Sequence, residues 1–206
     1  MSGYSDKYFI NEICSSDVGS KTARRGLVTV AGQSSVFILQ SLSIIILARM
    51  LTPDDFGLVS MVTVLLVLIR FFRDLGLTKA TIQSAEISRC QVSNLFWINV
   101  GVSALLTIFI VLSAPLIASF YGREELVYVS VALAIGILVE GVGLQHRSLM
   151  VRAMQFRKLT LIDVSAQFIA VSTAVLLAYL GYGYWALVFL PIIGASIRSV
   201  FLFTST

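Results

Sequence analysis

The sequence has few charged residues, and this scarcity argues against a soluble fold. Only 13% of the 206 residues are Asp, Glu, Lys or Arg, whereas 57% are hydrophobic. Soluble domains contain about a quarter charged residues, so a soluble chain of this length could not bury so much apolar surface. Three prolines and one histidine leave little room for a disordered tail or a histidine-based metal site. The composition indicates an integral membrane protein.

Uncharged stretches locate the membrane crossings. No charged residue falls within 26–48, 90–122 or 164–197. The last two exceed one crossing of about 20 residues, and the turn "GYGYW" divides the third. In lipid, each segment must satisfy its own backbone hydrogen bonds, so all crossings should be helices. The sequence therefore predicts an all-α integral membrane protein with six transmembrane helices, at about 26–48, 54–75, 93–119, 125–146, 160–180 and 184–204.

The distribution of Lys and Arg predicts the orientation of these helices. If the N-terminal side is called the inside, Arg49 and Arg123 are the two basic residues outside, and the remainder of the 15 lie inside. Basic residues are enriched in cytoplasmic loops, so both termini should be cytoplasmic. Cys14 and Cys90 then lie on the reducing side, and no disulfide is expected.

Two adjacent acids, Asp54 and Asp55, interrupt a nearly continuous hydrophobic stretch. If Thr52 caps the second helix, Pro53 occupies its first position and Asp55 completes a variant of the capping box. Gly76 is then expected to end the same helix. A metal-dependent "DDxxD" enzyme would need further acids in helical register, which "DDFGL" lacks. The acids therefore favour a turn between two crossings over a catalytic site, although direct substrate contact remains an alternative.

Several short motifs follow one another along the chain: "LARMLTPDDFGLVSMVTVLL", "RDLGLTKATIQ", "NLFWINVGVS", "APLIASFYGREEL", "GLQHRSLMVRAMQFRKLTLID" and "GYGYWALV". In order and spacing they resemble, over residues 24–203, the polysaccharide and lipopolysaccharide biosynthesis flippases. These flippases belong to the multidrug/oligosaccharidyl-lipid/polysaccharide exporter superfamily. The resemblance implies an inner-membrane transporter that moves a polyprenyl-pyrophosphate-linked sugar unit to the outer leaflet for lipopolysaccharide or exopolysaccharide synthesis. It implies no catalysis, metal or cofactor.

The resemblance also implies a domain organisation and a set of partners. Family members are longer and have two lobes, so the six predicted crossings are equivalent to one lobe of a two-lobed flippase. Residues 1–23 are expected to form a mobile cytoplasmic extension, and residues 24–206 the helical bundle. The expected partners are the lipid-linked oligosaccharide, the bilayer and a second six-helix lobe, which is a second copy or a separate chain. No nucleic-acid partner is expected.

Polar side chains at membrane depth are the candidates for a substrate cleft. Gln33 and Gln40 lie seven residues apart in the first helix, and Asn99 begins a shorter polar stripe in the third. These stripes are either cleft walls or polar contacts between helices. Arg70 and Arg73 lie near the cytoplasmic end of the second helix, where they either extend to the membrane interface or bind pyrophosphate through their forked guanidinium groups.

Arg198 and Glu140 are the more deeply placed charges. Arg198 follows Pro191 in the sixth helix and lies about 21 Å from that helix's start, where a buried cation without a partner would be costly. Glu140 lies in the fourth helix among glycines. It either couples transport to protons or pairs with Arg198 or Arg70.

Three rival functions fit the same helical pattern less well. A membrane enzyme acting on lipid phosphates would need an acidic metal cluster, a Ser–His pair or an "HExxH" motif, none of which the sequence contains. A drug exporter would share the fold and differ only in motifs. A truncated remnant without transport activity is also compatible.

Asp163 has a structural interpretation, because Thr160 precedes it at capping-box spacing at the start of the fifth helix.

Overall fold

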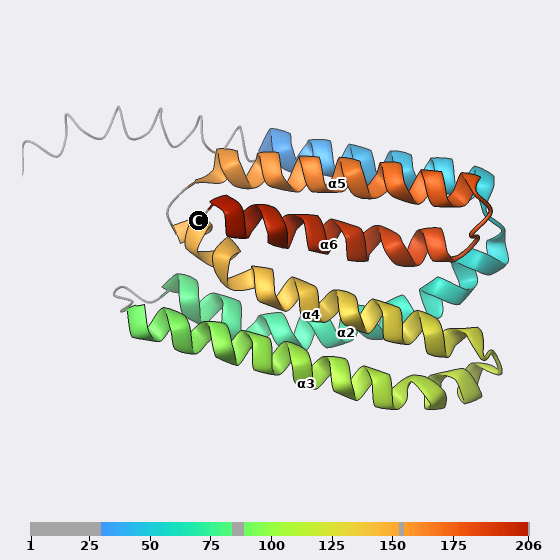
Figure 1. Cartoon of the computed structure of the whole chain (residues 1–206), viewed down its shortest axis with the longest axis horizontal. Coiled ribbons are helices and arrows are strands. Elements are labelled where there is room, and N and C mark those ends of the chain that lie inside the picture. The colour runs from blue at the N-terminus through green and yellow to red at the C-terminus, as the bar shows by residue number, and fades with distance from the viewer. Residues whose placement is uncertain (1–29, 84–88, 153–154, 206) are drawn as a thin grey trace, which may run out of the picture.

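The described part of the chain is helical throughout apart from short connections. A computed structural model describes residues 30–83, 89–152 and 155–205, and within these ranges it has no strands. The helices (Figure 1) are Val30–Met50, α2 Pro53–Gln83, α3 Arg89–Tyr121, α4 Glu125–Arg152, α5 Phe156–Tyr179 and α6 Trp185–Ser205. The predicted all-α fold is confirmed. The extension proposed for residues 1–23 lies outside the described residues.

Five of these helices are long and apolar enough to cross a membrane: Val30–Met50, Trp97–Tyr121 within α3, Glu125–Ser148 within α4, α5 and Trp185–Thr204 within α6. Many large apolar side chains lie on the outer surface of the bundle, as lipid-facing residues would. Phe120 is 82% exposed and Leu112 is 71% exposed. The protein is therefore a multi-pass membrane protein. A sixth crossing, by α2, stays a prediction, although α2 lies beside α3 and α4 in Figure 1.

The helices alternate in direction, so Val30 and the C-terminal end of α6 lie at one end of the bundle (Figure 1). The connections at 51–52, 122–124 and 180–184 all lie at the opposite end. We call this opposite end the loop end. Gly181 and Gly183 have φ angles of 83° and 55°, as the tight turn predicted from "GYGYW" requires.

Small residues bring α4 close to its neighbours. A Cβ atom on Gly141 would overlap the Ser103 side chain of α3, and one on Gly143 would lie 2.6 Å from Ser199 Oγ of α6. Ser199 Oγ donates a hydrogen bond of 3.0 Å to the Val139 carbonyl. Close approach at small residues is how helices pack tightly in lipid, where burial of apolar surface no longer drives association. As a result, α4 is the most buried of the five helices that could cross a membrane.

The start of α2 forms as predicted from the acidic pair. Thr52 N–H donates to Asp55 Oδ2 at 3.0 Å, and Asp55 N–H donates to Thr52 Oγ at 3.3 Å, which completes the capping box. The predicted end at Gly76 is wrong, because α2 continues to Gln83. Glycine lowers helix stability by only about 1 kcal/mol, and the residues that follow Gly76 remain compatible with a helix.

The predicted start of the fifth helix is also wrong. α5 begins at Phe156, and its N-cap, Gln155, makes no side-chain capping hydrogen bond. Thr160 therefore lies inside the helix, where it cannot act as a cap. Asp163 instead binds Arg147 on α4. The capping-box spacing of Thr160 and Asp163 therefore occurs inside α5 and does not mark its start.

An ion pair joins two connections at the loop end. Arg123 donates to both carboxylate oxygens of Asp54 at 2.7 Å. These hydrogen bonds hold the pKa of the Asp54 carboxyl below its usual value and raise the pKa of Arg123. Asp55 lies next to Gly183, since a Cβ atom there would lie 3.2 Å from Asp55 Oδ1. The acidic pair thus contacts both other connections at this end.

Candidate functional site

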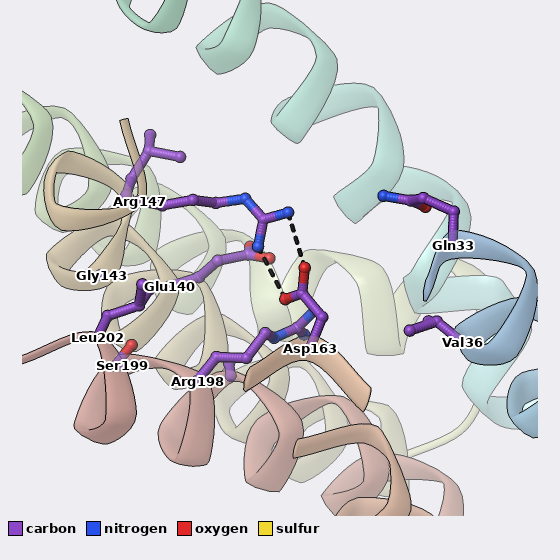
Figure 2. A pocket seen from close by; sticks show the side chains of 11 residues that line it. Gln33, Val36, Glu140, Gly143, Arg147, Asp163, Arg198, Ser199 and Leu202 are labelled. Atoms are coloured by element: carbon purple, nitrogen blue, oxygen red, sulfur yellow. Dashed lines mark hydrogen bonds and ion pairs between the residues drawn. The ribbon is translucent and has the colours of Figure 1, made fainter. Parts of the chain in front are cut away.

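A polar cavity of about 290 Å³ lies between the helix Val30–Met50, α4, α5 and α6. It lies in the half of the bundle that is remote from the loop end, because its residues come from the late part of α4 and the early part of α5. The polar residues that line it include Gln33, Glu140, Arg147, Asp163, Arg198 and Ser199 (Figure 2). Charged side chains of both signs therefore share one cavity inside an otherwise apolar bundle.

Arg147 and Asp163 form the central pair of this cavity. Arg147 Nη1 and Nη2 donate to Asp163 Oδ1 and Oδ2 at 2.8 and 3.0 Å. The Asp163 side chain is 15% exposed and that of Arg147 is 37% exposed, so the pair is less exposed than Asp54 and Arg123. A bidentate contact between guanidinium and carboxylate fixes both side chains in one plane. The pair links α4 to α5, which also packs against α6 and, at Thr160, against Gly32 of the helix Val30–Met50.

Arg198 approaches the same cavity from α6. Its Nε donates to the Gly194 carbonyl of its own helix at 3.1 Å. No carboxylate among the described residues forms a salt bridge with Arg198. The predicted Glu140–Arg198 ion pair is therefore not formed. Glu140 lines the cavity, and both side chains extend toward the Arg147–Asp163 pair in Figure 2.

This arrangement suits a small anionic group with hydrogen-bonding oxygens. Two guanidinium groups offer forked donors that match phosphate as well as carboxylate geometry. Gln33 reaches the cavity from the helix Val30–Met50 and adds an amide that can bind hydroxyl or phosphate oxygens (Figure 2). The volume is at the lower limit of the roughly 300–1,000 Å³ usual for ligand pockets. It therefore fits a head group and not a long lipid chain.

The cavity brings together three of the seven residues proposed from the sequence: Gln33, Glu140 and Arg198. Gln40 is exposed on the surface of its helix and does not line the cavity. Asn99 is 3% exposed, and its backbone carbonyl faces Gly141 across the α3–α4 interface, which is the environment expected for helix packing.

Arg70 and Arg73 lie on α2, but their side chains are outside the described part of the structure. Whether Glu140 pairs with Arg70 therefore stays a prediction. The side chains of α2 beyond residue 69 add nothing to the description of the cavity.

Sequence reasoning missed Arg147 and Asp163 as site residues. It counted Arg147 only as a topology signal and assigned Asp163 to a helix cap. A usable signal was present, because the two residues lie at equal distances on either side of Gln155. Antiparallel helices joined by a short connection place such residues side by side. An opposite-charge pair at these positions predicts an interhelical contact.

The sequence of residues 46–206 matches the family described as "Polysaccharide biosynthesis protein". The chain belongs to this family. The polysaccharide biosynthesis family covers α2 to α6 completely, and so it includes the Arg147–Asp163 pair, Glu140 and Arg198. The resemblance noted from the sequence motifs is thereby confirmed. No solved structure shows significant similarity to the chain.

Three curated relatives have names that concern polysaccharide synthesis or transport. The chain is 28% identical over 182 residues to the succinoglycan biosynthesis transport protein ExoT of Rhizobium meliloti, which is 88% of this chain and 37% of that protein. It is 28% identical to the lipopolysaccharide biosynthesis protein WzxC of Escherichia coli, over 75% of this chain and 30% of WzxC. It is 32% identical to the teichuronic acid biosynthesis protein TuaB of Bacillus subtilis, over 71% of this chain and 32% of TuaB. The chain thus spans about a third of the length of these relatives.

Proposed function

We propose that this bundle is part of a flippase that moves a polyprenyl-pyrophosphate-linked saccharide across the bacterial inner membrane. In this proposal the cavity between α4, α5 and α6 binds the pyrophosphate head group and its first sugar. The product would enter lipopolysaccharide or exopolysaccharide synthesis. Family membership supports the polysaccharide role, and the cavity supports the charged, lipid-linked form of the substrate.

The observation that carries the proposal is the position of Arg198. Arg198 has no carboxylate partner within the part of the chain that the structure describes. A cation at membrane depth in this state is costly, and a bound anion would offset that cost. The Arg198 Nε already binds a backbone carbonyl of its own helix, so the terminal nitrogens are the groups available to a ligand. Phosphate oxygens suit this donor set, since charge-assisted hydrogen bonds to phosphate are about twice as strong as neutral ones.

We also propose that transport requires a second bundle of the same kind. Substrate sites of two-lobed transporters lie at the interface of two repeats, and alternating access moves one repeat against the other. The second bundle would come from further sequence, a separate chain or a second copy of this chain. We place the end of the bundle that holds Val30 and the C-terminus in the cytoplasm, because most Lys and Arg residues belong to that side.

The first test is binding of farnesyl pyrophosphate, a short polyprenyl pyrophosphate, to the purified chain in detergent, measured by isothermal titration calorimetry. Arg198→Gln should weaken binding at least tenfold, in line with about 1.5–3 kcal/mol for a hydrogen bond to a charged group. Arg49→Gln is the matched control, because Arg49 is an exposed arginine at the loop end. Equal affinities for wild type and Arg198→Gln would refute the assignment of the cavity.

The second test is transport. The chain should be reconstituted into liposomes alone and with a candidate second bundle, and its mass in detergent determined in both cases. The proposal expects translocation of a lipid-linked saccharide, detected by lectin access from outside, only when a two-bundle assembly is present. A two-bundle assembly that binds the head group but leaves the saccharide on one side would support the rival interpretation, a remnant without transport activity.

A further inference from the structure

The two bidentate arginine–carboxylate pairs of the described chain differ in their surroundings. Arg123 and Asp54 lie at the loop end, where their side chains are 40% and 66% exposed. Arg147 and Asp163 line a cavity, with side chains 37% and 15% exposed. Arg123 also lines a hollow at the loop end, but its pair is open to solvent there. The Arg147–Asp163 pair instead lies in the cavity that Glu140 and Arg198 also line, where further charged side chains can contact a competing anion.

A carboxylate and a phosphate bind a guanidinium group in the same way. Each presents two oxygens in one plane to two parallel N–H donors of the fork. The Asp163 oxygens, at 2.8 and 3.0 Å from the Arg147 nitrogens, therefore lie where two phosphate oxygens would lie. Both anions cannot occupy this position at once, and like charges in a partly desolvated cavity repel each other.

The cavity contains few other cations that could bind whichever anion, phosphate or carboxylate, does not occupy Arg147. Arg198 is the other cation, and Glu140 is a second acidic group on the cavity wall. Two arginines and two acids make the formal charge of the described cavity zero when all four are ionised. A pyrophosphate group adds negative charge to this balance. Its binding is therefore opposed as long as both carboxylates remain close to the arginines.

We propose that the Asp163 carboxylate competes with a phosphate group of the ligand for the Arg147 guanidinium, so that ligand binding exchanges Asp163 for phosphate at this guanidinium. Asp163 then lowers the affinity of the cavity for the phosphate ligand. The exchange keeps the forked bonds of Arg147 and breaks the ion pair between α4 and α5. This inference rests on the proposed head-group site and adds the residue that the head group must displace.

The exchange gives α5 a specific role. Asp163 lies in the first half of α5, and Arg147 is its ion-pair partner on α4. The C-terminal half of α5 packs against the helix Val30–Met50 and α6 through Ala174 and Ala186. Leu159 and Ile162 in the first turns of α5 also form an apolar cluster with Met150 of α4 and Leu202 of α6, so the exchange removes the polar link between α4 and α5 and leaves these apolar contacts. Ligand binding and the Arg147–Asp163 ion pair become mutually exclusive.

The test is the effect of Asp163→Asn on the affinity for three probes: inorganic pyrophosphate, farnesyl pyrophosphate and phosphatidylglycerol, each titrated into the full chain in detergent. Removing the competing charge should tighten binding about fivefold or more, the lower part of the usual range for coupled equilibria. The matched control is Asp54→Asn, which neutralises the acid of the other bidentate pair and should leave the affinity unchanged. Equal or weaker binding by a folded Asp163→Asn protein would overturn the inference.

The three probes identify the source of the phosphate. The variants distinguish failure of this inference from failure of the proposed function. Tighter binding of both pyrophosphates alone identifies the lipid-carrier head group, and equal tightening for phosphatidylglycerol identifies a bilayer phosphate as the competitor. In Arg147→Gln the gain from Asp163→Asn should disappear. Wild-type binding that Arg198→Gln weakens, without any gain in Asp163→Asn, would refute the exchange and leave the head-group site standing. No binding by any of these variants would refute both.

A measurement on the wild-type protein covers the case in which Asp163→Asn does not fold. Saturating farnesyl pyrophosphate should increase hydrogen–deuterium exchange in the first turns of α5, between Phe156 and Asp163, since these turns lose their ion pair with α4 and keep only apolar contacts there. The C-terminal half of α5 should not change. Unchanged or slower exchange in the first turns, at a concentration that saturates binding, would contradict the release of Asp163.

Discussion

Gly141 offers the most direct test of the helix packing that positions the cavity. A Cβ atom at this position would lie 2.5 Å from the Cβ of Ser103, well inside ordinary van der Waals contact. The Ser103 Cβ cannot rotate away, so α3 and α4 would have to separate. Such overpacking destabilises a protein by about 1–3 kcal/mol, whereas alanine gains about 0.5–1 kcal/mol over glycine inside a helix. Gly141→Ala should therefore lower stability by about 1–2 kcal/mol.

The assay is the apparent Tm of the purified chain in detergent, followed by size-exclusion chromatography after heating. A change of 1 kcal/mol corresponds to about 2–4 °C for a chain of this size, so Gly141→Ala should lower Tm by roughly 2–8 °C. Gly101→Ala is the matched control, because Gly101 lies inside α3 and a Cβ atom added there would meet no neighbouring atom within 4 Å. That variant should be as stable as the wild type or more stable.

A second substitution shows whether the contact itself is responsible. Ser103→Gly removes both Cβ and Oγ, and it should restore most of the stability lost in Gly141→Ala. Ser103→Ala removes only Oγ, leaves the Cβ at 2.5 Å, and should restore little. If Gly141→Ala proved as stable as Gly101→Ala, the close approach of α3 and α4 at this point would be refuted.

Three further predictions concern the loop end. Thr52→Ala should lower stability by about 1 kcal/mol, as loss of an N-cap does, and Thr52→Ser should retain it; thermal unfolding measures both. Asp54→Asn should lower Tm at pH 7, and this difference from wild type should vanish as the pH falls through the lowered pKa of Asp54, below the ordinary 3.8, because only the ionised carboxylate binds Arg123. Gly183→Ala should destabilise more than Gly122→Ala, since both have positive φ angles of 55° and 68° but only the former would meet a carboxylate at 3.2 Å.

The fold class and much of the loop end could be predicted because they depend on local signals. Long uncharged stretches define crossings directly, since charge at membrane depth is expensive. The capping box at Thr52 and Asp55 involves residues three apart in the chain, and the turn at Gly181 and Gly183 depends on residues that adopt positive φ readily. These features need no knowledge of how the helices pack.

The cavity could be predicted only in part because it depends on contacts between helices. Glu140 and Arg198 stood out as charges inside apolar segments, and both line the cavity. Arg147 and Asp163 lie near helix ends, where charges are common, so neither residue stands out alone, and only their symmetric placement about Gln155 indicates a contact. The rotation of α4 and α5 about their axes brings them together, and the sequence of one helix does not specify it. Gln33 and Gln40 share one helix face and are both exposed, but Gln40 lies two turns further along the helix and does not line the cavity.

The contacts at the loop end determine how far α5 needs to move to break the Arg147–Asp163 ion pair. Asp54 binds Arg123 and Asp55 lies against Gly183 at that end, so the proposed release of Asp163 would let α5 tilt about its C-terminal end, next to the two glycines. Asp163 lies about 24 Å along the helix from Tyr179, and a tilt of about 5° moves it by about 2 Å over that length. This displacement is enough to break hydrogen bonds of 2.8 and 3.0 Å. In the proposed exchange, a small rotation of α5 at the loop end is therefore enough to switch the charge pairing at the other end of this helix.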